Sequence, residues 1–194
     1  MKYCARCGTV MNEPAYFALK AANAKPDGRV ICPVRGCYNE IIDVDETFIP
    51  LLKRLYDAGV VTMHSCAGHF WELEDRCEDI YLTYDYDFDV AGKGLLKKFT
   101  ENLISLAKPG AYDFLEVKPV HESSEAINGY RDLDGERQAA RTVIRVSAKK
   151  PAVRRDTSLL KKHAALLRRQ AEFILAIEEA LRDAELSVKE TKRR

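Results

Sequence analysis

Two short cysteine loops near the start of the chain constrain its fold more than any other sequence feature. The loops are Cys4-Ala5-Arg6-Cys7 and Cys32-Pro33-Val34-Arg35-Gly36-Cys37. Residues 15–25 and 29–32 between them are predicted to be strands joined at Pro26-Asp27-Gly28. Four thiolates on two such loops complete a tetrahedral structural zinc site. We therefore expect residues 1–38 to form a zinc ribbon with one structural Zn²⁺, bound by Cys4, Cys7, Cys32 and Cys37; the alternative is free cysteines without metal.

The composition indicates a folded protein inside the cell. With 194 residues and 46% hydrophobic content, the chain can bury one main core with small appendages. Its 31 basic and 30 acidic residues nearly cancel, so the overall charge does not point to nucleic acid. No apolar run approaches the roughly 20 residues of a membrane helix, and the N-terminus lacks a signal peptide's apolar core. We expect a cytoplasmic protein without membrane contact, in which the six cysteines favour metal ligation over disulfides.

Residues 79–88 show the clearest strand pattern, because apolar and polar residues alternate there without interruption. Ile80, Leu82 and Tyr84 fall on one face of this strand. Residues 39–148 as a whole are expected to form an α+β domain in the order strand, helix, strand, strand, helix, strand. This is the order of a ferredoxin-like two-layer sandwich. The expected elements are residues 39–43, 45–58, 60–66, 79–88, 96–106 and 112–120, with an extra strand at 142–148 on the sheet edge.

After a linker at 149–155, residues 156–188 are predicted to form one long helix. Residues at steps of three and four along it make a heptad seam. The seam consists of Leu160, His163, Leu167, Gln170, Ile174, Ile177, Leu181 and Ala184. Basic residues gather in the first half of the helix and acidic residues in the second, which suits an antiparallel partner. We therefore expect a homodimer through this coiled-coil-like helix, with packing across its own domain as the alternative.

Pairs of basic residues recur every seven positions along this helix and just before it. The pairs are Arg154/Arg155, Lys161/Lys162 and Arg168/Arg169. Such a stripe could follow a phosphate backbone, although few aromatic residues beside it could stack on bases. Residues 72–89 carry eight acids and would repel a polyanion. Nucleic-acid binding by the stripe is therefore an alternative role.

The strand at 60–66 ends in a turn that carries a thiol and imidazoles. The period of two places His64 and Cys66 on one face, where acids of the next strand could converge on them. A glycine in the turn would let a ligand approach the backbone closely. The candidate ligand-binding residues are His64, Ser65, Cys66, Gly68, His69, Asp85 and Asp87.

Other roles for this turn stay open. Cys66 and His69 could hold a second metal together with one of His64, Cys77 or a carboxylate. Cys66 beside an imidazole could also be an activated thiol. The structural alternative is a buried cysteine next to two hydrogen-bonded histidines.

Residues 45–69 resemble the signature segment of a known family. The segment reads Asp45-x-x-x-Ile49-x-x-Leu52-x-x-Leu55, followed by Thr62-x-x-Ser65-Cys66-Ala67-Gly68-His69. It is similar to that of the wybutosine-synthesis methyltransferases, which methylate a modified tRNA guanosine with S-adenosylmethionine and carry Thr-Ser-Ser-Cys-Ser-Gly-Arg in this place. Ala67 replaces a serine of that run, and His69 stands where the family has arginine. Small uncharacterised bacterial and phage proteins with a Ser-Cys-Ser-Gly-His turn look more similar still.

The resemblance implies a shared fold core with a ligand site, and S-adenosylmethionine as a candidate cofactor. Our main hypothesis is an intracellular zinc-binding protein with a small-molecule or nucleotide site, used for binding or regulation, around Cys66 and His69. The first alternative is an enzyme that modifies RNA or a nucleotide, such as an S-adenosylmethionine-dependent methyltransferase. The second alternative is a nucleic-acid-binding adaptor that uses the ribbon and the basic helix. The sequence shows no complete catalytic pair, so it leaves open whether the protein is an enzyme.

Overall fold

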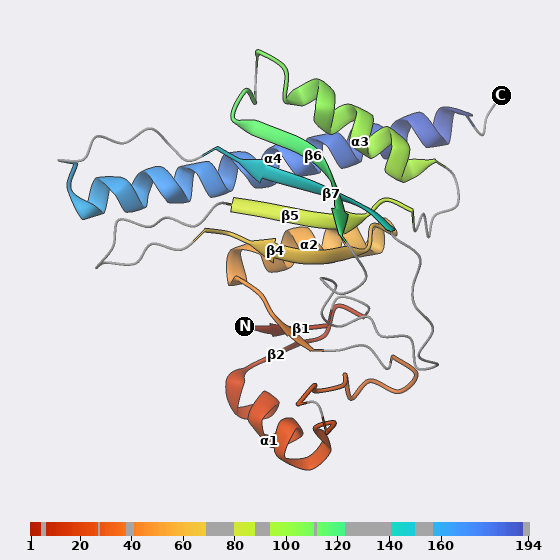
Figure 1. Ribbon diagram of the computed structural model, residues 1–194, viewed down its shortest axis with the longest axis vertical. Helices are drawn as coiled ribbons and strands as arrows, with labels where there is room; N and C mark the ends of the chain where they lie inside the picture. Colours follow the sequence, from red (N-terminus) through yellow and green to blue (C-terminus); the bar gives the residue numbers. More distant parts are fainter. Residues whose placement is uncertain are drawn as a thin grey trace.

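The computed structural model of the chain describes residues 1–4, 7–26, 28–37, 41–68, 80–87, 94–110, 112–122, 141–149 and 157–191. These residues form an α+β structure with a long C-terminal helix, as predicted, and their strands form two antiparallel sheets (Figure 1). The strands are β1 (Lys2–Tyr3), β2 (Val10–Met11), β3 (Ile42–Asp43), β4 (Thr62–Cys66), β5 (Ile80–Asp85), β6 (Leu115–Glu122) and β7 (Arg141–Ala148). The helices are α1 (Glu13–Asn23), α2 (Ile49–Asp57), α3 (Leu95–Leu106) and α4 (Leu159–Thr191), and a 3₁₀ turn at Glu46–Phe48 precedes α2.

Helix α1 occupies the place of the first predicted ribbon strand. The side chain of Asn12 caps the helix by accepting a hydrogen bond from the N–H of Ala15 at 2.9 Å, and Pro14 lies in the first turn. Residues 15–25 contain five alanines and no β-branched residue, which favours a helix. The prediction of a strand at 15–25 is therefore wrong, and the zinc ribbon as a fold is not confirmed. The predicted turn is present, because the N–H of Gly28 donates to the carbonyl of Lys25 at 2.8 Å.

Two strands lie elsewhere than predicted. β3 pairs with β1 in the small sheet, which has the order β2-β1-β3, so it does not begin a ferredoxin-like sheet. The large sheet has the order β4-β5-β7-β6, with antiparallel neighbours throughout. β7 is therefore a central strand and not an edge strand. Its residues Val143, Ile144 and Val146 are buried on both faces of the sheet, a pattern that an internal strand requires.

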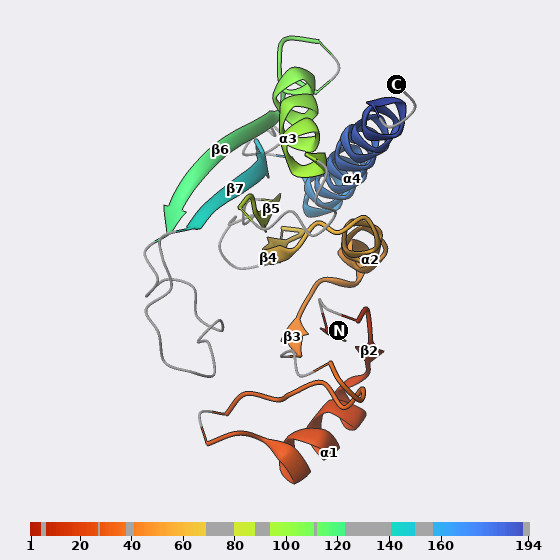
Figure 2. The same cartoon turned by 90° about the vertical axis from the view of Figure 1, so that its right-hand side faces the viewer.

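Helices α2, α3 and α4 cover one face of the large sheet (Figure 2). Ile80, Leu82 and Tyr84 are buried on that face, as the alternation predicts. The ring of Tyr84 lies 5.2 Å from that of Phe99 in α3, and its hydroxyl forms a hydrogen bond of 2.7 Å with Thr100. The opposite face, turned away from the three helices, is called the outer face below. By register the outer face carries Cys66, Tyr81, Thr83, Asp85, Glu116, Lys118, Arg145 and Ser147.

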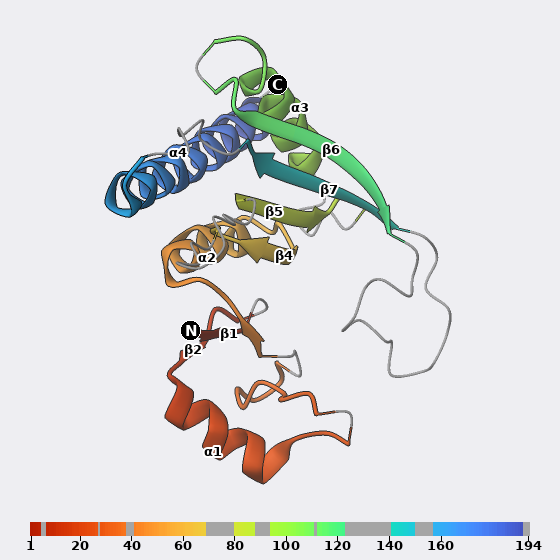
Figure 3. The ribbon, with the colours of Figure 1, turned by 60° about the vertical axis from the view of Figure 1, so that its left-hand side comes forward.

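The second half of α4 packs on its own domain. Phe173 is fully buried and stacks on Phe48, with ring centroids 5.8 Å apart. Arg54 of α2 forms a bidentate ion pair with Glu185, and Asn102 of α3 donates to the carbonyl of Ala180 at 3.1 Å. The first half of α4 projects beyond the large sheet (Figures 1 and 3). None of the described helices combines the length and apolar character needed to cross a membrane.

The heptad seam divides between these two halves. A seam of period 3.5 drifts by about 20° per heptad around a straight helix of 3.6 residues per turn. Ile177, Leu181 and Ala184 are therefore on the buried face, whereas Leu160 and Leu167 are on the exposed one. Packing across the own domain, the alternative stated above, accounts for the second half of the seam.

Candidate functional site

The four N-terminal cysteines converge in space as their spacing predicts. Their sulfur atoms all lie within 4.8 Å of one another. Cys4 Sγ lies 3.5 Å from Cys37 Sγ, and Cys7 Sγ lies 3.5 Å from Cys32 Sγ. Four soft thiolates at such distances form the donor set that tetrahedral zinc prefers, and they leave no coordination position for a substrate. The cluster could therefore hold a metal ion such as zinc in a closed structural site.

Each cysteine loop is closed by a backbone hydrogen bond and has a glycine with a positive φ angle in it or directly after it. The N–H of Gly8 donates to the carbonyl of Cys4 at 2.9 Å, and the N–H of Cys37 donates to the carbonyl of Val34 at 3.0 Å. Gly8 and Gly36 have φ angles of 70° and 81°, a region in which glycine avoids the Cβ clash. The two loops thereby aim their sulfur atoms at a common centre.

The thiols differ in exposure and in acidity. Cys4, Cys32 and Cys37 are buried, whereas Cys7 is exposed. Burial raises the pKa of Cys7, but hydrogen bonds from the side chain and backbone of Thr9 outweigh it and hold the pKa at about 7. Burial raises the pKa of Cys32. Of these two thiols, Cys7 loses its proton more readily than Cys32, and a metal ligand must be deprotonated.

Tyr3 links the cysteine cluster to the large domain. Its side chain is buried and belongs to the main core together with Leu51 and Leu55 of α2. Burial, with a smaller contribution from the charge of Cys4, raises the pKa of Tyr3 to about 12. A metal that orders the cysteine loops therefore also orders a residue of the main core.

The turn after β4 is fastened from two distant elements. The N–H of Ala67 donates to Asp45 Oδ2 at 2.7 Å. Gln170 of α4 donates from Nε2 to the carbonyl oxygens of Ala67 at 2.6 Å and Gly68 at 3.4 Å. Cys66 is buried, and its sulfur accepts the N–H of Gly68 at 3.4 Å. Residues 66–68 are thus held in one conformation by contacts that the sequence pattern did not reveal.

Replacing Gln170 by methionine is expected to destabilise the protein. Methionine has a similar volume but no N–H, so the buried carbonyl of Ala67 loses its donor at a cost of about 1–3 kcal/mol in the free energy of unfolding. Urea denaturation of the variant and of the exposed control Lys189→Met measures this cost. Equal midpoints for the two variants would show that the Gln170 contact does not fasten the turn.

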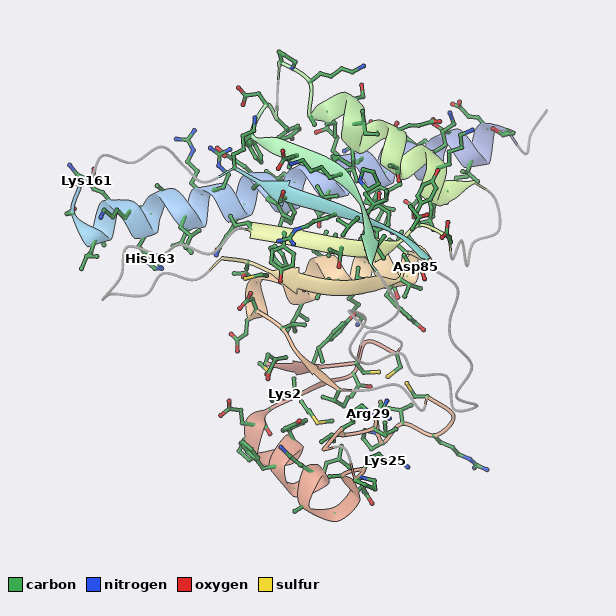
Figure 4. All side chains as sticks on the ribbon, viewed as in Figure 1. Lys2, Lys25, Arg29, Asp85, Lys161 and His163 are labelled. Atoms are coloured by element: carbon green, nitrogen blue, oxygen red, sulfur yellow. The ribbon has the colours of Figure 1, made fainter. Side chains whose placement is uncertain are left out.

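The predicted carboxylates lie at the other end of β5 from Cys66. Cys66 pairs with Tyr81, so Asp85 is four residues further along the strand, about 13 Å away at the usual rise. Asp85 Oδ1 accepts the N–H of Asp87 at 3.0 Å, and Asp87 Oδ2 accepts the N–H of Thr142 at 2.6 Å. Figure 4 shows Asp85 at the opposite end of the molecule from Lys161 and His163 of α4. The two aspartates order the β5–β7 end of the sheet and do not meet Cys66.

A β-bulge also changes which residues of β4 lie on each face of the large sheet. The pairing shifts between Thr62 and His64, so that Thr62 pairs with Tyr84 on the helix-covered side and His64 with Thr83 on the outer side. Thr62 therefore does not share the face of His64 and Cys66, although an uninterrupted period of two would place it there. Ser65 pairs with Leu82 and lies on the covered side, while Cys66 lies on the outer face.

The structure brings Tyr81 and Arg145 together beside Cys66, a pair that sequence reasoning missed. The guanidinium carbon of Arg145 lies 4.0 Å from the centroid of the Tyr81 ring. Lys118 is directly opposite Arg145 across the β6–β7 ladder and forms an ion pair of 2.6 Å with Glu116. Alternation in 141–148 places Arg145 opposite to the core-facing residues, but only the strand order shows that Tyr81 is its neighbour. The outer face therefore carries an aromatic ring next to Cys66 and two cations on the strands beyond it.

The basic stripe of α4 is interrupted. The guanidinium of Arg169 packs 4.1 Å from the ring centroid of Phe114, so it faces inward. Arg168 is exposed and donates to Glu172 at 3.0 Å. Lys161 is exposed and Lys162 half-buried. Arg154, Arg155, His69, Cys77 and the His64 side chain lie outside the described residues, so nucleic-acid binding and the second metal stay predictions.

No family model, no curated protein and no solved structure matches the chain. The resemblance of residues 45–69 to the wybutosine-synthesis methyltransferases therefore stays a prediction. The same holds for S-adenosylmethionine as a cofactor, for the cytoplasmic location and for the homodimer.

Proposed function

We propose that this chain is a zinc-stabilised protein that binds a small phosphate-bearing ligand of the nucleotide type on the outer face, beside Cys66 and the following turn with His69. The observation that carries the proposal is the position of Arg145, whose guanidinium carbon lies 4.0 Å from the ring centroid of Tyr81, the residue that pairs with Cys66. No carboxylate among the described residues forms an ion pair with Arg145. Its N–H donors are therefore oriented by the ring and remain for an anion.

The surroundings of Arg145 favour a small ligand over a long nucleic acid. Lys118 adds a second cation opposite Arg145, but Glu116 offsets part of its charge. Thr83, which pairs with Arg145, is buried, and so are Asp85 and Val143 further along the outer face. In the sequence, residues 72–89 carry eight acids, and this negative charge disfavours a polyanion. A nucleotide needs only one aromatic ring and one or two cations, whereas a polyanion needs a longer basic track.

Calorimetric titration of the zinc-loaded chain with ATP, S-adenosylmethionine and inorganic phosphate tests the proposal. We expect saturable binding of ATP or inorganic phosphate, weakened about 10- to 100-fold by Arg145→Gln, because charge-assisted hydrogen bonds contribute about 1.5–3 kcal/mol. Arg182→Gln is the matched control, since this arginine is exposed on α4.

The choice of probe separates the hypotheses about the ligand. Binding of S-adenosylmethionine that Arg145→Gln weakens would favour the methyltransferase-like alternative for the same site. Binding of ATP alone would favour a nucleotide-binding or regulatory role. The absence of binding for both ATP and inorganic phosphate, or equal affinities of the Arg145→Gln and Arg182→Gln variants, would contradict the proposal.

A further inference from the structure

The solvent-facing side of α4 carries a continuous apolar stripe. Its residues are Leu160, Ala164, Leu167, Ala171 and Leu175, all of them exposed. Steps of four, three, four and four place them on one side of the helix. Leu160 is 79% exposed and Leu175 is 57% exposed, so this stripe is not part of the core. These five residues are called the Leu-Ala stripe below.

The Leu-Ala stripe is distinct from the face of α4 that packs on the domain. The buried face contains Leu166, Gln170, Phe173 and Ile177, roughly a third of a turn around the helix. Both faces are apolar, although a helix that packs only on its own domain needs just one apolar stripe. Large leucines alternate with alanines along the Leu-Ala stripe. Such an alternation lets a second helix approach closely at the alanines and pack between the leucines.

Charges beside the Leu-Ala stripe identify the partner that fits. Lys161 and Arg168 flank the stripe in its first half, and Glu172 and Glu179 flank it further along on the same side. In an antiparallel pair of identical helices, each flank meets the same flank of the other copy. If the two helices cross at Ala171, the flanking positions bring Lys161 beside Glu179 and Arg168 beside Glu172 of the other copy. Within one chain Glu172 already accepts a hydrogen bond from Arg168, and Glu179 accepts one from Tyr112, so the contacts between copies add to these.

We propose that the Leu-Ala stripe is the contact surface for a second copy of this chain, which binds antiparallel with the two helices crossing at Ala171. Leu167 of each copy then packs against Leu175 of the other around the alanine pair. The half of α4 that projects beyond the large sheet gives a partner access (Figure 3). The stripe from Leu160 to Leu175 is only about 22 Å long, so we expect a concentration-dependent dimer and not a permanent one.

Sedimentation equilibrium of the full zinc-loaded chain over a range of concentrations tests the proposal. We expect a shift from 22.0 kDa toward twice that mass as concentration rises. Leu167→Glu is expected to weaken the dimer at least about 10-fold. Ile104→Glu is the matched control, because Leu167 and Ile104 are both 48% exposed, in α4 and α3 respectively. A chain that stays at 22.0 kDa up to about 100 μM, where a specific dimer would assemble, overturns the proposal.

Cysteine cross-linking tests the direction of the two helices. Under mild oxidation, Ala171→Cys is expected to form a disulfide-linked dimer, since the two positions meet at the crossing. Leu160→Cys is expected to stay monomeric, because in the antiparallel arrangement the two copies of this position lie far apart. Cross-linking of both variants would show a parallel pair, and cross-linking of neither would show no such contact; either result overturns the proposal. The unmodified chain, treated in parallel, accounts for its own cysteines.

Discussion

Replacing Cys37 by serine is expected to abolish zinc binding and to unfold the N-terminal module, defined as residues 1–44. The small core of this module consists of Cys4, Cys32, Cys37 and Ile41. Such a core is too small to be stable alone, whereas a structural zinc on four thiolates contributes about 10–16 kcal/mol. We expect one zinc per wild-type chain and close to none in Cys37→Ser by mass spectrometry. Hydrogen exchange should show that the amides of α1 lose protection in the variant.

Cys66→Ser is the control, because this thiol is buried in the large domain far along the chain from the cysteine loops. With a single structural site, Cys66→Ser keeps one zinc per chain. Two zincs in the wild type and one in Cys66→Ser would instead establish the second metal site that Cys66, His69 and Cys77 could form. A wild-type chain purified and reconstituted with zinc that binds none would contradict the assignment of the four-cysteine cluster.

The position of the metal cluster could be predicted from the sequence because ligation chemistry is specific. Two pairs of closely spaced thiols have few other uses in a reducing compartment, whatever fold lies between them. The fold between the loops was predicted wrongly for a local reason. Residues 15–25 favour a helix, Asn12 caps it and Pro14 suits its first turn, and these local signals outweigh the ribbon pattern.

The large sheet and its outer face were harder to predict, because they depend on long-range pairing. The alternation of 79–88 indicates which residues of β5 are buried, but it does not show that β7 is the next strand. Tyr81 and Arg145 are therefore neighbours only once the strand order is known. Gln170 and Ala67 are 103 residues apart, and in the sequence Gln170 is only one position of the heptad seam. The candidate ligand site thus depends on contacts between residues far apart in the sequence, and a local pattern does not predict such contacts.

Replacing Phe173 by alanine is expected to destabilise the protein more than any other single change in α4. Phe173 is fully buried and stacks on Phe48, just before α2, with the two rings almost parallel at 9°. Removing a buried phenylalanine ring typically costs about 3–5 kcal/mol, a large share of the roughly 5–15 kcal/mol that keeps a domain folded. Thermal unfolding should show a lowering of the midpoint by about 10 °C for a chain of this length.

The matched control is Leu186→Ala, because Leu186 lies on the same helix, is 53% exposed and is outside the Leu-Ala stripe. Its effect should stay within about 0.5 kcal/mol. If Phe173→Ala cost no more than Leu186→Ala, then α4 would not pack on α2 within one chain, and its seam would be free along its whole length for a partner. A large cost for Phe173→Ala, together with loss of the dimer in Leu167→Glu at unchanged stability, would assign the two apolar faces of α4 to separate roles. The buried face of α4 then holds the domain together, and the Leu-Ala stripe joins two copies.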